Sequence, residues 1–188
     1  TETEIDPTVQ TNDINGWPQG DAIESDAAIC MDGNTGAVLY GKNIEKQEYP
    51  ASITKIMTLI LIFDAIDAGK IRLGDEVVTS AHAKSMGGSQ VFLEAGETQS
   101  VDTMIKCISV ASANDAAVAL AEFVGGSEEA FCRLMNDKAK ALGMENTHFV
   151  NACGLDAEGH YSSAADVSIM ARELMKHKDI FKYSGIWL

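Results

Sequence analysis

An apolar segment, Ile56 to Phe63, follows directly on the polar pair Ser52 and Lys55. Its apolar residues cover every side of the helix that their spacing predicts, instead of forming a single stripe. A helix of that kind has to be buried on all sides, so we expect it at the centre of a globular domain. The segment is also far shorter than the roughly 20 residues that span a bilayer. It therefore predicts a core helix with a hydroxyl and an amine at its entrance.

The composition is that of a globular chain with an acidic balance. The 188 residues suit one domain or a large part of one, and 46% of them are hydrophobic and 22% charged. The formal net charge of −14 argues against nucleic acid or an anionic membrane as the main partner. We attribute the acidity to solubility.

The chain divides into a short lead-in and one domain. Residues 1–20 are polar and patternless, which predicts a flexible N-terminal segment without an apolar leader peptide, and residues 21–188 form the domain. Two apolar runs, 27–31 and 37–40, flank the sequence Asp-Gly-Asn-Thr-Gly and predict a β-hairpin. A two-stranded hairpin is marginal by itself, so we expect further strands that these residues do not supply.

Four further helices are expected after the central one, which follows Pro50 and stops at Gly69. Short strands and turns occupy residues 71–99, and the chain turns around 112–114 into an Ala-rich helix that ends at a Gly-Gly pair. The other three helices each begin at a serine of the kind that caps helix N-termini: Ser100, Ser127 and Ser163. The pattern predicts a helix-rich α/β fold.

The cysteines and histidines predict neither a cofactor nor a metal site. Neighbours of the four cysteines are mostly apolar, which favours buried free thiols, although three pairings are arithmetically possible. No C-x-x-C or H-E-x-x-H occurs, and His148, Cys153 and His160 lack a known ligand spacing.

Ser52 and Lys55 have the spacing of an activated nucleophile. Three residues along a helix bring two side chains onto one face, so Lys55 can act as the base that removes the Ser52 proton. Burial would lower the lysine pKa, and the free backbone N–H groups of a helix N-terminus suit an oxyanion. Alternatively, Ser52 could be only a helix cap and Lys55 a solvated lysine. A charged residue without a role is unusual directly before a helix that is apolar on all sides.

Ser112 and Asn114 form a second S-x-N pair at another turn-to-helix junction. A catalytic interpretation makes Ser112 a proton relay to the leaving amine and Asn114 the amide that orients Lys55 and the substrate. As an alternative, both could simply cap the helix that begins near Asp115. The two pairs together are more specific than either one.

Several longer segments resemble the penicillin-binding D-alanyl-D-alanine carboxypeptidases, low-molecular-mass serine peptidases of bacterial cell walls. The resemblance runs in the family's order through DGNTGAVLY (32–40), ASITKIMT (51–58), GSQVFLEAG (88–96), SANDAAVALAE (112–122), MNDKAKALGMENTHFVNACGL (135–155) and YSSAAD (161–166). It implies a β-lactamase/transpeptidase-like fold, a helical cluster with an N-terminal hairpin of an antiparallel sheet.

The resemblance also implies an activity and its residues. Ser52 would be the acyl-enzyme nucleophile, Lys55 the general base, Ser112 the relay and Asn114 the substrate-binding amide. The substrate would be a peptidoglycan stem peptide ending in D-Ala-D-Ala, and β-lactams would acylate the same serine. The location it implies is extracytoplasmic.

One family signature, the K-T-G strand that binds the substrate carboxylate, does not occur in these 188 residues. We therefore expect the N-terminal part of a catalytic domain, with later sheet strands missing and little activity by itself. Unpaired sheet edges would also favour self-association.

Two rival functions use the same fold: a β-lactamase, and a non-catalytic penicillin or muropeptide sensor. Residues 140–165 show no obvious deacylating carboxylate, although Asp156 and Glu158 lie there. A Ser-His-Asp hydrolase is least favoured because no G-x-S-x-G occurs, and His82 and His160 are interpreted as surface or structural residues.

Overall fold

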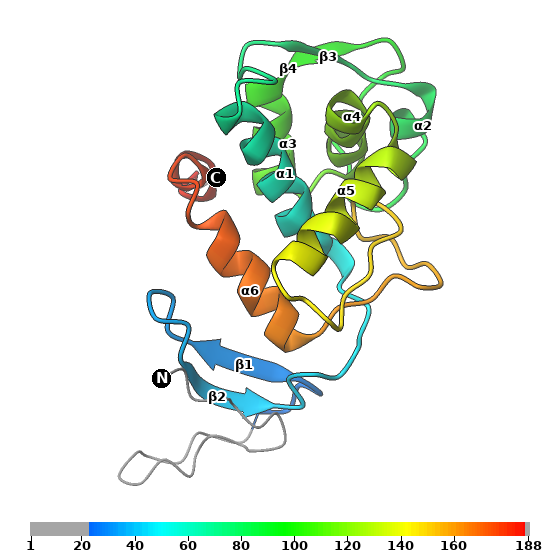
Figure 1. Cartoon of the computed structure of the whole chain (residues 1–188). Helices are drawn as coiled ribbons and strands as arrows, with labels where there is room; N and C mark the ends of the chain where they lie inside the picture. The colour runs from blue at the N-terminus through cyan, green and yellow to red at the C-terminus, as the bar shows by residue number, and fades with distance from the viewer. Residues whose placement is uncertain (1–22, 187–188) are drawn as a thin grey trace, which may run out of the picture.

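The computed structural model describes residues 23–186, in which a cluster of helices stands beside a two-stranded hairpin (Figure 1). The expected flexible segment 1–20 lies outside these residues. In chain order the elements are β1 (Ala28–Met31), β2 (Val38–Lys42), a 3₁₀ helix (Ala51–Thr54), α1 (Lys55–Asp67), β3 (Glu76–Val78), α2 (Ala81–Lys84), β4 (Thr98–Ser100), α3 (Val101–Ala111), α4 (Asn114–Gly125), α5 (Glu128–Ala141), α6 (Ala164–Leu174) and α7 (Ile180–Ser184).

The predicted hairpin is confirmed. Strands β1 and β2 pair antiparallel, with Ala28 opposite Lys42 and Cys30 opposite Tyr40. Asp32 closes the turn, because its Oδ1 accepts hydrogen bonds from the backbone N and the Oγ1 of Thr35, both at 2.7 Å. The sheet contains only these two strands among the described residues, so its outer edges carry no strand partner there.

Helix α1 lies at the centre, as its all-round apolar pattern predicts. Figure 1 shows it among α3, α4, α5 and α6. Leu59, Ile62 and Phe63 belong to a core cluster shared with α3 and α4. Met57 and Ile60 belong to a second cluster shared with α5 and α6. The two core clusters meet at α1. Their packing therefore fixes this helix and, with it, the residues at its N-terminus.

Serine caps set three of the predicted helix starts. Each capping Oγ accepts the backbone N–H three residues ahead, which satisfies a donor that the helix itself leaves free. The pairs are Ser100 with Thr103, Ser127 with Ala130, and Ser163 with Asp166. Helix α2 was not predicted: it is only four residues long, too short for a periodic pattern, although Ser80 caps it in the same way.

The expectation of buried free thiols holds only in part. All four cysteines are free, and Cys132 and Cys153 are buried, whereas Cys107 is half-buried. Cys30 is exposed, so its apolar neighbours were misleading. It alternates with Ile29 and Met31 along β1, and alternation in a strand turns one residue of each pair to the opposite face.

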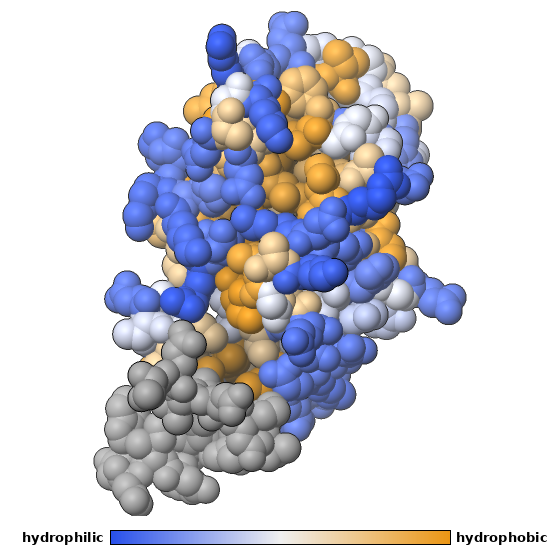
Figure 2. Space-filling model, in the orientation of Figure 1, coloured by the Kyte–Doolittle hydropathy of each residue, from blue (hydrophilic) through white to orange (hydrophobic). Residues whose placement is uncertain are grey.

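One face of the surface mixes hydrophilic and hydrophobic areas. In Figure 2 hydrophobic residues show as patches between hydrophilic ones on the face turned to the viewer. Among residues 23–186 no helix combines the length and hydropathy needed to cross a bilayer.

Candidate active site

Ser52 and Lys55 are brought into hydrogen-bond contact at the entrance to α1. Ser52 lies in the 3₁₀ helix and Lys55 is the first residue of α1. Side chains three residues apart eclipse each other in a 3₁₀ helix, and the Lys55 Nζ accordingly lies 3.1 Å from the Ser52 Oγ. Ser52 is exposed, whereas Lys55 is only 4% exposed. A reachable hydroxyl therefore adjoins a buried amine.

Burial lowers the pKa of the Lys55 amine, and the nearby Cys153 thiol acts more weakly in the opposite direction. The Nζ donates a hydrogen bond of 2.7 Å to the backbone oxygen of Cys153, 98 residues further along the chain. A lysine whose charged form is disfavoured can accept a proton from a neighbouring hydroxyl. The pair thus has the two properties that a nucleophile and its base require.

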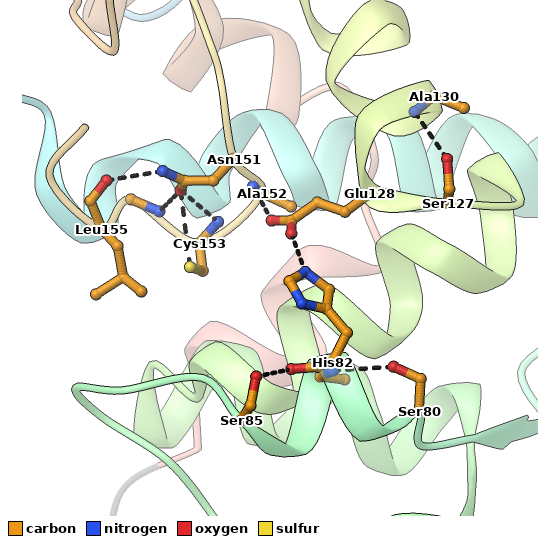
Figure 3. A network of polar contacts seen from close by, with 12 residues as sticks. Ser80, His82, Ser85, Ser127, Glu128, Ala130, Asn151, Ala152, Cys153 and Leu155 are labelled. Atoms are coloured by element: carbon orange, nitrogen blue, oxygen red, sulfur yellow. Dashed lines mark hydrogen bonds and ion pairs between the residues drawn. The ribbon is translucent and has the colours of Figure 1, made fainter. Parts of the chain in front are cut away.

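The Cys153 carbonyl that Lys55 contacts belongs to the segment Asn151–Leu155, and Figure 3 shows the hydrogen bonds within this segment. The Asn151 Oδ1 accepts from the backbone N of Cys153 at 3.2 Å and of Gly154 at 2.7 Å. Its Nδ2 donates to the Leu155 oxygen at 2.7 Å. Nothing in the sequence marks this segment as the partner of Lys55, because a backbone carbonyl has no side-chain signature.

Gly154 lets this segment approach the 3₁₀ helix Ala51–Thr54, which carries Ser52, closely. Its φ is +92°, and a Cβ at this position would lie 1.8 Å from the backbone oxygen of Ala51 and 3.0 Å from the Oγ1 of Thr54. Only glycine fits such an approach at such a φ. Residue 154 is therefore in direct backbone contact with the residue before Ser52.

Ser112 and Asn114 stand at the junction of α3 and α4. Asn114 is 4% exposed and is held twice: its backbone N donates to the Ser89 oxygen, and its Nδ2 to the Gly87 oxygen, both at 2.7 Å. Its Oδ1 is buried without a hydrogen-bond partner. Within residues 23–186 no hydrogen bond joins this pair to Ser52 or Lys55, so the expected orienting contact from Asn114 to Lys55 is not present in this structure.

Gly88 connects the two halves of the site. A Cβ on it would meet the Asn114 Nδ2 at 2.8 Å and the Leu155 side chain at 3.7 Å. The turn 87–89 thus lies against both Asn114 and the segment that contacts Lys55. The four candidate residues occupy neighbouring elements, with Ser52 and Lys55 in direct contact.

Backbone strain accompanies both motifs. Four non-glycine residues of the described chain have positive φ, and two of them are Ala51 at +45° and Ser112 at +53°. Such conformations are uncommon for non-glycine residues and persist only where the surroundings enforce them. Both occur beside or within a candidate catalytic pair.

His160 supports the turn that carries Ser52. Its Nε2 lies 2.8 Å from the Thr54 Oγ1, and its Nδ1 accepts from the backbone N of Val150 at 3.1 Å. The ring is 1% exposed, and burial lowers its pKa. The interpretation of His160 as structural agrees with this position, and His82 lies half-exposed against Glu128.

We expect the free energy of unfolding to decrease as the pH falls below about 6.5, the pKa of an unfolded histidine. The folded chain holds His160 neutral with a lowered pKa, so below that pH the unfolded chain binds more protons and gains stability relative to the folded one. Urea unfolding across this range should show a shallower pH dependence in His160→Gln. Equal slopes in the two proteins would contradict the prediction.

A surface hollow of about 630 Å³ lies elsewhere, between α2 and α5, with His82, Glu128 and Arg133 among its lining residues. None of the four candidate residues lines it. In the part of the chain that the structure describes, no three histidine, cysteine or acidic side chains gather as a metal site would require.

Comparisons with known proteins point to one family. The family profile described as D-alanyl-D-alanine carboxypeptidase matches residues 14–186. The D-alanyl-D-alanine carboxypeptidase DacF of Bacillus subtilis is 55% identical over 166 residues, which are 88% of this chain and 43% of that protein. The chain thus spans less than half the length of this relative.

Solved structures of penicillin-binding proteins have the same fold. Penicillin-binding protein 6B from Escherichia coli superposes with a TM-score of 0.82 at 36% identity, over 87% of this chain and 53% of that one. Penicillin-binding protein D2 from Listeria monocytogenes, in its ampicillin-bound form, gives 0.76 at 28% identity, over 86% and 66%. The expected transpeptidase-like α/β fold is confirmed. On the family profile and the Bacillus relative together, this chain belongs to the D-alanyl-D-alanine carboxypeptidase family.

Proposed function

We propose that the protein to which this chain belongs is a serine D-alanyl-D-alanine carboxypeptidase that trims peptidoglycan stem peptides. One observation carries the proposal: the exposed Ser52 hydroxyl lies 3.1 Å from the nitrogen of the buried Lys55. A hydroxyl becomes a useful nucleophile only when a base can take its proton, and here the base is built in. Family membership supports the choice of reaction.

In the proposed reaction the neutral Lys55 takes the Ser52 proton while Oγ attacks the carbonyl carbon between the two terminal D-alanines. The C–N bond then breaks, and the amine of the released D-alanine receives the proton by way of Ser112. An ester remains on Ser52. Water hydrolyses this ester and restores the serine, with Lys55 again handling the proton.

Asn114 is proposed as the substrate-binding amide. Its Nδ2 is occupied by the Gly87 oxygen, but its Oδ1 is buried and unpartnered. Leaving a buried acceptor unsatisfied costs about 1–3 kcal/mol, which an amide N–H of a bound peptide would recover. This supports contact of Asn114 with the substrate, whereas the Cys153 carbonyl is the group that orients Lys55 here.

The proposal extends to partners and location. β-Lactams would acylate Ser52 in place of the peptide, and ampicillin occupies the related Listeria protein. An extracytoplasmic location and a part in maintaining cell shape would follow from a cell-wall substrate. Self-association through the free edges of β1 and β2 is a further proposal, supported by the lack of strand partners for them in the described residues.

The test is the intact mass of the chain after prolonged incubation with benzylpenicillin. We expect one penicillin-sized adduct, located on the peptide that contains Ser52, and no adduct in Ser52→Ala. The readout is acylation, not turnover, because the 188 residues contain no K-T-G sequence and loss of one oxyanion donor costs about 10²–10³ in turnover.

The lifetime of the adduct separates the proposal from its rivals. A long-lived ester that D-Ala-D-Ala peptides compete away supports a carboxypeptidase. Rapid release of hydrolysed penicillin would indicate a β-lactamase instead. An adduct that persists in Ser52→Ala, or none in the parent chain, would contradict the proposed nucleophile.

A further inference from the structure

We propose that Glu128 is a positioning residue for Lys55, because it holds the segment Asn151–Leu155 in the place where the Cys153 carbonyl meets the lysine amine. The catalytic consequence of this role rests on the proposed function, but the contacts themselves do not. Glu128 is the first residue of α5 and lies outside both sequence motifs.

Glu128 binds the segment directly. Its Oε1 accepts a hydrogen bond from the backbone N of Ala152 at 2.9 Å. Its Oε2 lies 2.6 Å from the Nε2 of His82 on α2. Figure 3 shows the carboxylate between these two groups, and the side chain is only 13% exposed. His82 of α2 thus fixes the side chain of Glu128, and Glu128 in turn holds the segment Asn151–Leu155.

The segment is anchored from the other side by α1. The Ala152 oxygen accepts from the Thr58 Oγ1 at 2.6 Å, and the next carbonyl, that of Cys153, accepts from the Lys55 Nζ at 2.7 Å. Ala152 therefore has its N–H tied to α5 and its C=O tied to α1. Without Glu128, the α5 side of this bridge loses its bond while the buried N–H of Ala152 is left without an acceptor.

Glu128 stands in the first turn of α5, where the free N–H groups and the helix dipole attract a negative charge. A hydrogen bond to a carboxylate is shorter and stronger than one to a neutral acceptor. The next residue, Glu129, has a different role: its side chain is 87% exposed and pairs with Arg133.

Holding the Cys153 carbonyl matters because it sets the direction of the lysine lone pair. A neutral amine has two N–H donors and one lone pair. When one N–H points at the Cys153 oxygen, rotation about the Cε–Nζ bond is restricted and the lone pair can face the Ser52 hydroxyl. Displacing a catalytic group by about 1 Å can cost about 10²-fold in rate.

Three variants test the proposal: Glu128→Ala removes the acceptor, Glu128→Gln keeps an acceptor oxygen without the charge, and Glu129→Ala is the matched control. In Glu128→Ala we expect faster hydrogen exchange at the Ala152 amide. The pKa of Lys55 should move up toward the ordinary lysine value, because water reaches the amine. Acylation of Ser52 by benzylpenicillin should be about 10–100-fold slower. Glu128→Gln should largely restore all three, and Glu129→Ala should change none.

The proposal would be overturned if the Ala152 exchange rate and the Lys55 titration were both unchanged in Glu128→Ala. It would also be overturned if Glu128→Gln showed the same changes as Glu128→Ala in all three measurements. If the parent chain is not acylated at all, the proposed function fails while exchange and titration still decide the role of Glu128. Glu128→Asp, which keeps the charge and shortens the reach, replaces the alanine variant if that one does not fold.

Discussion

Acylation of Ser52 by benzylpenicillin is expected to be about 10²–10⁴-fold slower in Lys55→Gln than in the parent chain, the range in which general-base catalysis contributes. Glutamine has no basic nitrogen, and its side chain is one atom shorter. Its amide is still a hydrogen-bond donor on the side of the Cys153 oxygen, so a polar group remains between α1 and the segment Asn151–Leu155. The loss should therefore fall on the chemistry and not on the fold.

The pH dependence of the parent reaction should identify the same base. Only neutral Lys55 accepts a proton, so the acylation rate should rise with pH and level off at the lysine pKa, which burial holds below its ordinary value of about 10.4. The variant should lack this rise. Time courses of adduct mass at several pH values measure both effects.

Lys70→Gln is the matched control for this experiment, because Lys70 is exposed just after α1. It should react like the parent chain. Parent-like rates in Lys55→Gln would show that another group accepts the Ser52 proton. A rate that falls equally in both variants would point to a general effect of charge on penicillin binding.

The features that the sequence predicted correctly are local ones. The hairpin turn, the serine caps and the spacing of Ser52 and Lys55 each depend on residues within a few positions of one another. The burial of α1 was also readable, since a helix that is apolar on every side has only one stable location. Local signals were thus sufficient for the entrance to α1 and for the contact between Ser52 and Lys55.

The features that it could not predict join distant segments through the backbone. Lys55 meets a carbonyl 98 residues away, and any residue type offers a carbonyl, so no pattern marks it. The unpartnered oxygen of Asn114 follows from where the turn 87–89 places the Gly87 carbonyl. In the sequence, Glu128 looks like any acidic residue in the first turn of a helix. Its contact with His82 depends on the packing of α2 beside α5, which no local pattern predicts.

Gly154→Ala should destabilise the chain by roughly 2–5 kcal/mol, since it combines two separate costs. The new Cβ would lie 1.8 Å from the Ala51 oxygen and 2.4 Å from its carbon, and these backbone atoms cannot rotate away. A φ of +92° is also unfavourable for any residue with a Cβ. Because Ala51 precedes Ser52, relief of the overlap would displace Ser52 as well.

Gly159→Ala separates the two costs, because Gly159 has a similar φ of +80° but its Cβ would meet nothing closer than 3.9 Å. Urea unfolding should show a clearly smaller loss of stability in this variant than in Gly154→Ala. Acylation of Ser52 should fall only in Gly154→Ala, measured at a temperature where both variants remain folded. Equal stability of the two would mean that the close approach of residue 154 to Ala51 does not hold the turn that carries Ser52 in place.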